Sequence, residues 1–206
     1  MFIDALGDKA EDLLARYRDR AALLLVRAVT DEHRRYTAKP TYEEVVDLHR
    51  IGKPRTSARK TSADRHGPFS KQTAYEGWKR SLYAANWFDS RPERTIANIL
   101  DASDDITCWI RLATGDLPIL WRSDGRTYNA DLIAIDNNDN RWVIEIKSNK
   151  DAPTAEVQAK REAAKRWANH VNADDKVPGT WHYLLLTEAD IDMAKDSWSA
   201  LKNLGA

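Results

Sequence analysis

Apolar residues recur with two different periods along the chain, and the change of period falls near residue 106. Upstream of it they repeat at intervals of three and four residues, which is the spacing of amphipathic helices. This pattern predicts helices over 4–35, 41–49, 70–85 and 90–100. Downstream, short runs rich in β-branched and aromatic residues predict strands over 106–112, 117–121, 132–135, 142–146 and 181–186. Two more helices are expected, one from Pro153 to Val171 and one from Thr187 onward.

A polar, basic and turn-rich stretch over 52–70 interrupts the helical part of the chain. Its prolines and Gly67 favour a loop. All eight tryptophans lie at Trp78 or later, so the main core is expected beyond this loop. We therefore predict an N-terminal helical segment with a basic loop over 1–69, followed by an α/β domain over 70–206.

The segment 128–148 is predicted to form a β-hairpin. Its polar residues at 136–140 favour a tight turn, because Asp and Asn tolerate left-handed backbone and bond their own main chain. A turn centred there pairs residues whose numbers sum to about 276, which sets Asp131 opposite Glu145. Because side chains alternate along a strand, Lys147 is expected on the same face as Glu145.

Two carboxylates side by side in an otherwise apolar hairpin are costly to bury without a cation between them. Mg²⁺ or Mn²⁺, which prefer oxygen ligands, would meet that need, and Lys147 could position or deprotonate a water. Such a group is the minimum that phosphodiester hydrolysis requires. The alternative is structural: Glu145 and Lys147 would form an exposed cross-strand ion pair on an edge strand, and Asp131 would only begin its strand.

Ser90 and Glu93 have the spacing of a capping box at the start of the helix predicted over 90–100. A cap is a sufficient reason for a glutamate at this position. The sequence by itself leaves open whether Glu93 also has a chemical role.

The net charge is zero, but between Arg50 and Arg80 nine Lys or Arg face only two acidic residues. Such a block can follow a phosphate backbone, and a solvated loop explains it equally well. The outer face of the helix after Pro153, which includes Lys160, could likewise contact DNA or be a solvated charged face. Cys108 is the single cysteine, so no intrachain disulfide can form. No apolar run is long enough to span a membrane and no signal-peptide pattern is present, so we expect a cytoplasmic protein.

The order of elements around Asp131, Glu145 and Lys147 resembles the PD-(D/E)XK nuclease superfamily, the restriction-endonuclease-like fold. More narrowly, the chain is similar to the C-terminal nuclease domain of type III restriction enzyme subunits and related helicase-nucleases over the segments 75–83, 88–93, 128–147 and 157–160. The resemblance implies an αβββαβ core, with a mixed central sheet flanked by helices. Two positions depart from the family pattern: Ala130 replaces the usual proline, and Glu162 stands where some relatives carry an aromatic residue.

The resemblance also implies roles for individual residues. The metal ligands would be Asp131, Glu145, the Ile146 carbonyl and Glu93, and Lys147 and Gln158 would join Glu93, Asp131 and Glu145 as catalytic residues. Contacts with DNA are expected from Arg55, Arg59, Lys60, Arg65 and Lys160.

Two functions follow as hypotheses. The first is a DNA endonuclease that uses Mg²⁺, with Mn²⁺ as a possible substitute, within a restriction or helicase-nuclease system. The second is an inactive DNA-binding or interaction module on the same fold. No phosphate-binding loop motif occurs, so a helicase or ATPase motor, or a specificity subunit, would belong to another chain or to a longer parent protein.

Overall fold

The computed structural model describes residues 19–20, 22–29 and 60–205. The described residues near the N-terminus are helical, in agreement with the central part of the helix predicted over 4–35. The rest of that helix and the helix predicted over 41–49 lie outside the described residues. Within the described part of the chain, no helix is long and apolar enough to cross a membrane.

Contacts divide the chain into two units, residues 1–50 and residues 51–206. The second unit is built on a mixed four-stranded sheet in the order β4-β7-β8-β9. Its strands are β4 (Ile106–Arg111), β7 (Leu132–Asp136), β8 (Asn140–Lys147) and β9 (Thr180–Thr187). β7 is antiparallel to both β4 and β8, whereas β9 is parallel to β8. A parallel pair needs a crossover connection, and helix α4 (Ala155–Asn172) provides it.

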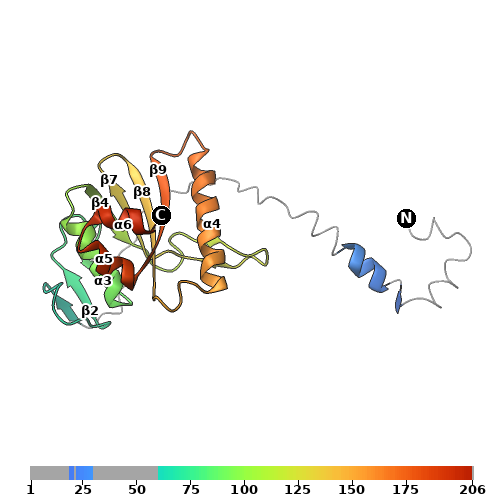
Figure 1. Ribbon diagram of the computed structural model, residues 1–206, viewed down its shortest axis with the longest axis horizontal. Coiled ribbons are helices and arrows are strands. Elements are labelled where there is room, and N and C mark those ends of the chain that lie inside the picture. The colour runs from blue at the N-terminus through green and yellow to red at the C-terminus, as the bar shows by residue number, and fades with distance from the viewer. Residues whose placement is uncertain (1–18, 21, 30–59, 206) are drawn as a thin grey trace, which may run out of the picture. The chain divides into compact units, whose positions relative to one another are not determined.

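Helices cover both faces of this sheet (Figure 1). One face packs against α3 (Arg91–Ala102), α5 (Glu188–Ala194) and α6 (Trp198–Gly205). The other face packs against α4. Alternation along β8 supplies both cores, because Ile144 is buried on the first face and Val143 on the second. The α/β class predicted from the sequence is therefore confirmed.

The helix predicted from Thr187 is present as two helices rather than one. Thr187 and Asp190 form a capping box at the start of α5. Lys195 and Asp196 then adopt left-handed backbone, with φ of 48° and 61°, and end the helix before α6 begins. The apolar stripe continues across the break, since Ile191, Ala194, Trp198 and Leu201 are all buried in the same core. That unbroken stripe is why the sequence predicts a single helix.

The helix predicted over 70–85 is wrong. This stretch forms strands β2 (Thr73–Glu76) and β3 (Ala85–Asn86), which pair with each other. β2 also pairs with β1 (Lys60–Ser62), a strand inside the predicted loop. Gly77 follows β2 with φ of 78°, a conformation outside the helix. The backbone N–H groups of Lys79 and Arg80 then bond the Asp101 carboxylate of α3 instead of carbonyls one helical turn earlier.

The two strands predicted over 106–112 and 117–121 do not pair with each other. β4 pairs with β7, and β5 (Ile119–Leu120) pairs with β6 (Thr127–Tyr128). The segment between β4 and β7 therefore forms a small separate hairpin that ends three residues before Asp131.

Candidate active site

Strands β7 and β8 pair in the register predicted from the sequence. Leu132 lies opposite Ile144, and Ile135 lies opposite Arg141. Just before β7 the register shifts, because the Asp131 N–H donates to the carbonyl of Ile144, the residue that already lies opposite Leu132, at 3.0 Å. The predicted pairing of Asp131 with Glu145 therefore lies beyond the regular ladder, although the charges of the two carboxylates interact.

Asp136 holds the turn that defines this register. Its carboxylate accepts hydrogen bonds from the Asn138 N–H (2.9 Å), the Asn140 N–H (3.0 Å) and the Trp142 indole N–H (3.1 Å). Asp139 has φ of 58°, the left-handed backbone expected for this cluster. The turn is therefore fixed by short-range bonds, which explains why it could be predicted.

Glu145 is buried, with only 4% of its surface exposed, and Asp131 is half-buried. Burial, followed by the nearby charge of Glu145, raises the pKa of Asp131 well above its ordinary value. Burial likewise raises the pKa of Glu145, although Lys147 opposes the change. One hydrogen bond partly compensates Asp131, because its Oδ2 accepts from the Ile146 N–H at 2.7 Å. The pair is therefore an electrostatically unfavourable arrangement that a cation would relieve.

Lys147 supplies the positive charge nearest to this pair. Its ammonium group forms an ion pair with Glu145 Oε1 and donates to the Ile146 carbonyl at 3.3 Å. Burial lowers the pKa of Lys147, but Glu145 and Asp131 outweigh burial and leave that pKa raised. Lys147 is therefore protonated at neutral pH, which favours a charge-stabilising role over that of a general base. The other oxygen, Glu145 Oε2, is buried and has no hydrogen-bond partner among the described residues.

Glu93 caps helix α3. The Glu93 N–H donates to Ser90 Oγ (3.3 Å), and the Glu93 carboxylate accepts from Ser90 Oγ (2.9 Å) and the Asp89 N–H (3.1 Å). A capping box would use the N–H of Ser90 itself, so the predicted box forms with its return bond shifted by one residue. Burial and then the charge of Asp131 raise the pKa of Glu93. The charge of Glu93 therefore interacts with that of Asp131, while both Glu93 carboxylate oxygens accept hydrogen bonds at the start of α3.

Among the described residues, no group of three or more His, Cys, Asp or Glu side chains is placed to hold a metal ion. Glu93 therefore does not join Asp131 and Glu145 in a preformed cluster. A smaller donor set does fit a hard cation: the Asp131 carboxylate, the Glu145 carboxylate with its unpartnered Oε2, and the Ile146 carbonyl. The Lys147 ammonium contacts two of these groups, Glu145 Oε1 and the Ile146 carbonyl.

Two residues of α4 were expected to contribute from beside the hairpin. The Gln158 amide donates to the Ala152 carbonyl at 2.7 Å, which fixes it at the start of the helix. Lys160 pairs with Glu156 at 2.6 Å, and its positive charge also acts on Glu145. Lys160 therefore lies near enough to Glu145 for the two charges to interact, and its contact with DNA stays a prediction.

The basic block has only two of its predicted DNA-binding residues in the described part of the chain, since Arg55 and Arg59 lie outside it. Lys60 is exposed on β1. Arg65 pairs with Asp101 at 2.6 Å and lies over the Trp78 ring at 4.5 Å. These contacts give Arg65 a structural role, and its contact with DNA stays a prediction.

Arg111 is a neighbour of the site that the sequence did not single out. It lies on β4 and pairs with Asp89 at 2.6 Å, and its Nε is 3.8 Å from the Glu93 carboxylate. Its charge lowers the pKa of Asp131, against the larger effect of burial. Arg111 lies opposite Leu132, the residue that follows Asp131. This position could have been predicted only if the pairing of β4 with β7 had been known.

Two tyrosines border the carboxylates on the α4 face, and sequence reasoning also missed their role. The Tyr128 and Tyr183 hydroxyls share a hydrogen bond, and burial raises the pKa of both. Tyr128 also donates to the Lys160 carbonyl at 3.1 Å.

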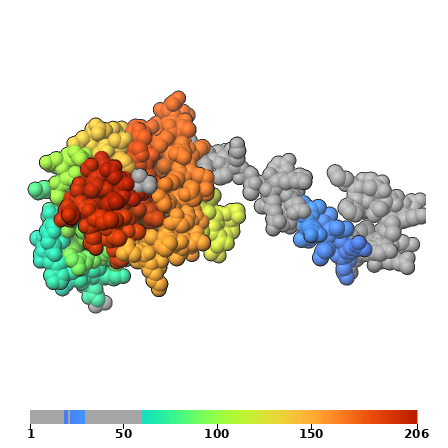
Figure 2. Space-filling view, viewed as in Figure 1, coloured from blue at the N-terminus to red at the C-terminus, as the bar shows by residue number. Residues whose placement is uncertain are grey.

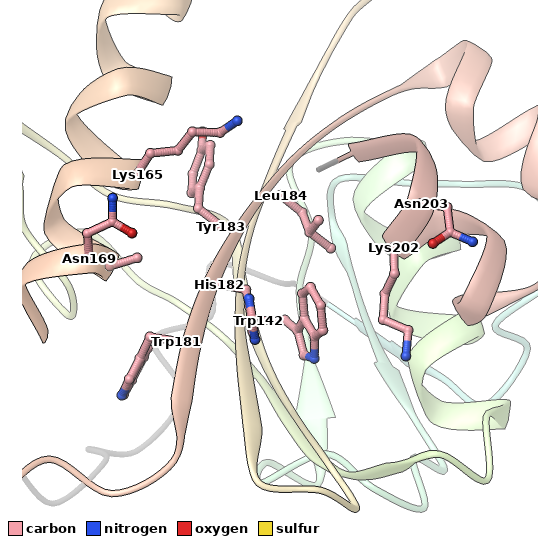
Figure 3. Close-up of a pocket in the computed structure, with 10 residues that line it drawn as sticks. Trp142, Lys165, Asn169, Trp181, His182, Tyr183, Leu184, Lys202 and Asn203 are labelled. Atoms are coloured by element: carbon pink, nitrogen blue, oxygen red, sulfur yellow. The ribbon is translucent and has the colours of Figure 1, made fainter. Parts of the chain in front are cut away.

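A pocket of about 540 Å³ lies along the outer edge of β9, and the carboxylates do not line it. Figure 3 shows β9 passing between Lys165 and Asn169 of α4 and Lys202 and Asn203 of α6. Part of this edge is closed by the chain itself, because the Asn172 amide bonds both the N–H and the carbonyl of Trp181. Such closure protects an edge strand from pairing with other chains.

The fold and the site together define an α/β protein with two interacting carboxylates, one buried and one half-buried, and an adjacent lysine at the end of a mixed sheet. Comparisons with protein-family models, with curated proteins and with solved structures find no match for this chain. The function must therefore be argued from the site.

Proposed function

We propose that this chain is a metal-dependent endonuclease that hydrolyses phosphodiester bonds in DNA, with Mg²⁺ as its cofactor and Mn²⁺ as a substitute. The observation that carries the proposal is the pair of half-buried Asp131 and buried Glu145, with Glu145 Oε2 unpartnered and Lys147 beside it. Two mutually repelling carboxylates that are shielded from water are unfavourable for stability, because apolar residues of similar size would pack at lower cost.

Asp131, Glu145 and the Ile146 carbonyl would hold the ion. The ion, when bound, would polarise the phosphate and lower the pKa of an attacking water. The chain's own residues would do the rest. Ile146 N–H orients Asp131, and Lys147 stabilises negative charge that develops on the phosphate oxygens. Arg111 would partly offset the negative charge of Glu93 at the edge of the site.

The arrangement of elements supports the same proposal. With the β5–β6 hairpin set aside, the order α3-β4-β7-β8-α4-β9 on a mixed sheet agrees with the αβββαβ order expected for a restriction-endonuclease-like core. In that family sequence recognition and ATP-driven movement belong to other domains or subunits. The isolated chain is therefore expected to nick DNA weakly, independently of ATP and with little sequence preference.

The test is nicking of supercoiled plasmid DNA with Mg²⁺, with Mn²⁺ and with EDTA. We expect conversion to open circles in either metal and none in EDTA. Glu145→Gln keeps the shape of the side chain but removes its charge, so nicking should be lost while the circular dichroism spectrum is unchanged. Asp175→Asn, in the exposed turn between α4 and β9, is the matched control. Equal nicking by Glu145→Gln and the parent would exclude the proposed site, and no nicking by the parent would favour the inactive module.

A further inference from the structure

The hairpin between β4 and β7 carries basic side chains that the proposed catalytic site does not use. In the connection between β5 and β6, the Trp121 N–H donates to the Arg126 carbonyl (3.1 Å) and the Gly125 N–H to the Arg122 carbonyl (3.2 Å). Gly125 has φ of 85°, which a side chain would disfavour. The hairpin is therefore defined in shape, and it presents Arg122 and Arg126 with exposed fractions of 47% and 66%.

This hairpin is fixed beside the carboxylates. The Lys160 ammonium of α4 lies 5.0 Å from the centre of the Trp121 ring. At the base of the hairpin, the Tyr128 hydroxyl donates to the Lys160 carbonyl at 3.1 Å. Tyr128 precedes Asp131 by three residues, so the chain passes directly from the hairpin into the site. In Figure 2 the yellow-green surface of this region projects beyond α4.

The hairpin arginines are held only weakly. Arg122 and Arg126 share one acidic partner, Asp124, at 3.1 and 3.4 Å. Ion pairs this exposed contribute little, so each guanidinium can exchange the carboxylate for another anion at small cost. A guanidinium group binds phosphate oxygens in a two-pronged geometry that matches its five N–H donors.

We propose that the β5–β6 hairpin is a substrate arm, in which Arg122 and Arg126 bind backbone phosphates of a nucleic acid on one side of the site. The inference rests on the proposed function for the identity of the substrate. Trp121 is covered by Lys160 and by Arg122, whose guanidinium lies 5.5 Å from the ring centre. The arm therefore binds phosphates and makes no contacts with bases, so its binding does not depend on the nucleotide sequence.

The experiment measures binding of fluorescent 20-nucleotide DNA, as duplex and as single strand, by anisotropy in EDTA, where no cleavage occurs. Arg122→Ala with Arg126→Ala is expected to weaken binding on the order of tenfold and to reduce the salt slope by about 2 for duplex and about 1.4 for single strand. Arg122→Lys with Arg126→Lys retains both charges, so it should keep the salt slope of the parent and lose less affinity than the alanine variant. The matched control removes two charges elsewhere, through Lys176→Ala and Lys195→Asn, since Asn tolerates the left-handed backbone at 195.

The possible outcomes distinguish failure of the proposed substrate arm from failure of the proposed nuclease activity. Lost affinity in the alanine variant would support the arm even if the parent does not nick plasmid, and the oligonucleotide that loses affinity identifies duplex or single strand as the ligand. Unchanged affinity and salt slope in a parent that does nick would overturn the arm and leave the nuclease standing. Failure of the parent to bind either oligonucleotide would also overturn the arm, as would an equal loss in the control.

Discussion

The ammonium group of Lys147 contacts the donors that a metal ion would use. It touches Glu145 Oε1 and the Ile146 carbonyl, and its raised pKa keeps it charged. In the absence of an ion, Lys147 therefore serves as the cation that the buried carboxylates require. Binding of a divalent ion would compete with Lys147 for Glu145.

Lys147→Ala is expected to abolish nicking while metal binding persists. Removing the competing ammonium group should tighten Mn²⁺ binding several-fold, because the ion no longer displaces an ion pair. Isothermal titration with Mn²⁺ measures the affinity, and Lys147→Arg tests whether charge alone is sufficient. Full nicking by purified Lys147→Ala would show that the assigned role of the lysine is wrong.

Asp131→Asn is expected to stabilise the metal-free protein at neutral pH. The pKa of Asp131 is raised in the folded state, so its stabilising contribution is complete below about pH 4 and is lost as the pH rises through the folded pKa. The substitution removes that loss and keeps an oxygen for the Ile146 N–H. Urea unfolding in EDTA should show a gain of at least about 1 kcal/mol at pH 8 and a smaller gain at pH 5. Equal differences at both pH values would contradict the raised pKa.

At the scale of elements, Glu93 links helix α3 to the β7–β8 hairpin. The carboxylate closes the first turn of α3 and is near enough to Asp131 for the two charges to interact. The Ser90 and Glu93 spacing is readable in the sequence, whereas the distance to Asp131 depends on where α3 packs.

Glu93→Ala removes the acceptor for the Asp89 N–H and Ser90 Oγ, and it should lower stability by about 1–2 kcal/mol. Glu93→Gln retains an acceptor, so it should melt close to the parent temperature and nick within tenfold of the parent rate. Thermal unfolding and the plasmid assay together distinguish the two roles. A Gln variant that melts normally but nicks slower by orders of magnitude would place Glu93 in the metal site.

At the scale of the whole molecule, Asp101 joins the β1–β3 sheet to the helix-covered core. It is 3% exposed and accepts from the Arg65 guanidinium (2.6 Å), the Lys79 N–H (2.9 Å) and the Arg80 N–H (2.9 Å). The Arg94 guanidinium makes a second link, to the Gly67 carbonyl at 2.7 Å. Residues upstream of 70 therefore contribute to the stability of the core.

A fragment of residues 60–206 is expected to fold, and a fragment of 70–206 to be less stable by roughly 3 kcal/mol. The shorter fragment lacks β1 and Arg65, which leaves buried Asp101 without its ion-pair partner. Chemical unfolding of the two fragments provides the comparison, and Arg65→Gln in the longer one isolates the ion pair. Equal stability would place the domain boundary at 69/70, as the sequence predicts.

The amino-acid sequence by itself determined the features that depend on neighbouring residues. The β7–β8 register follows from the polar turn at 136–140, the cap at Ser90 follows from its spacing to Glu93, and Thr187 marks the start of a helix. The interacting groups lie within a few residues of one another, so local chemistry was sufficient to predict them.

Tertiary structure alone decided the partners that come from distant parts of the chain. The stretch 70–85 has apolar spacing typical of a helix, yet Asp101 takes its backbone N–H groups and β1 pairs with it. Arg111 reaches the site only because β4 pairs with β7, across the inserted hairpin. Periodicity reports which side of an element is apolar, but not which distant groups will satisfy its hydrogen bonds. The energy of those long-range bonds overrode the local helical preference at 70–85.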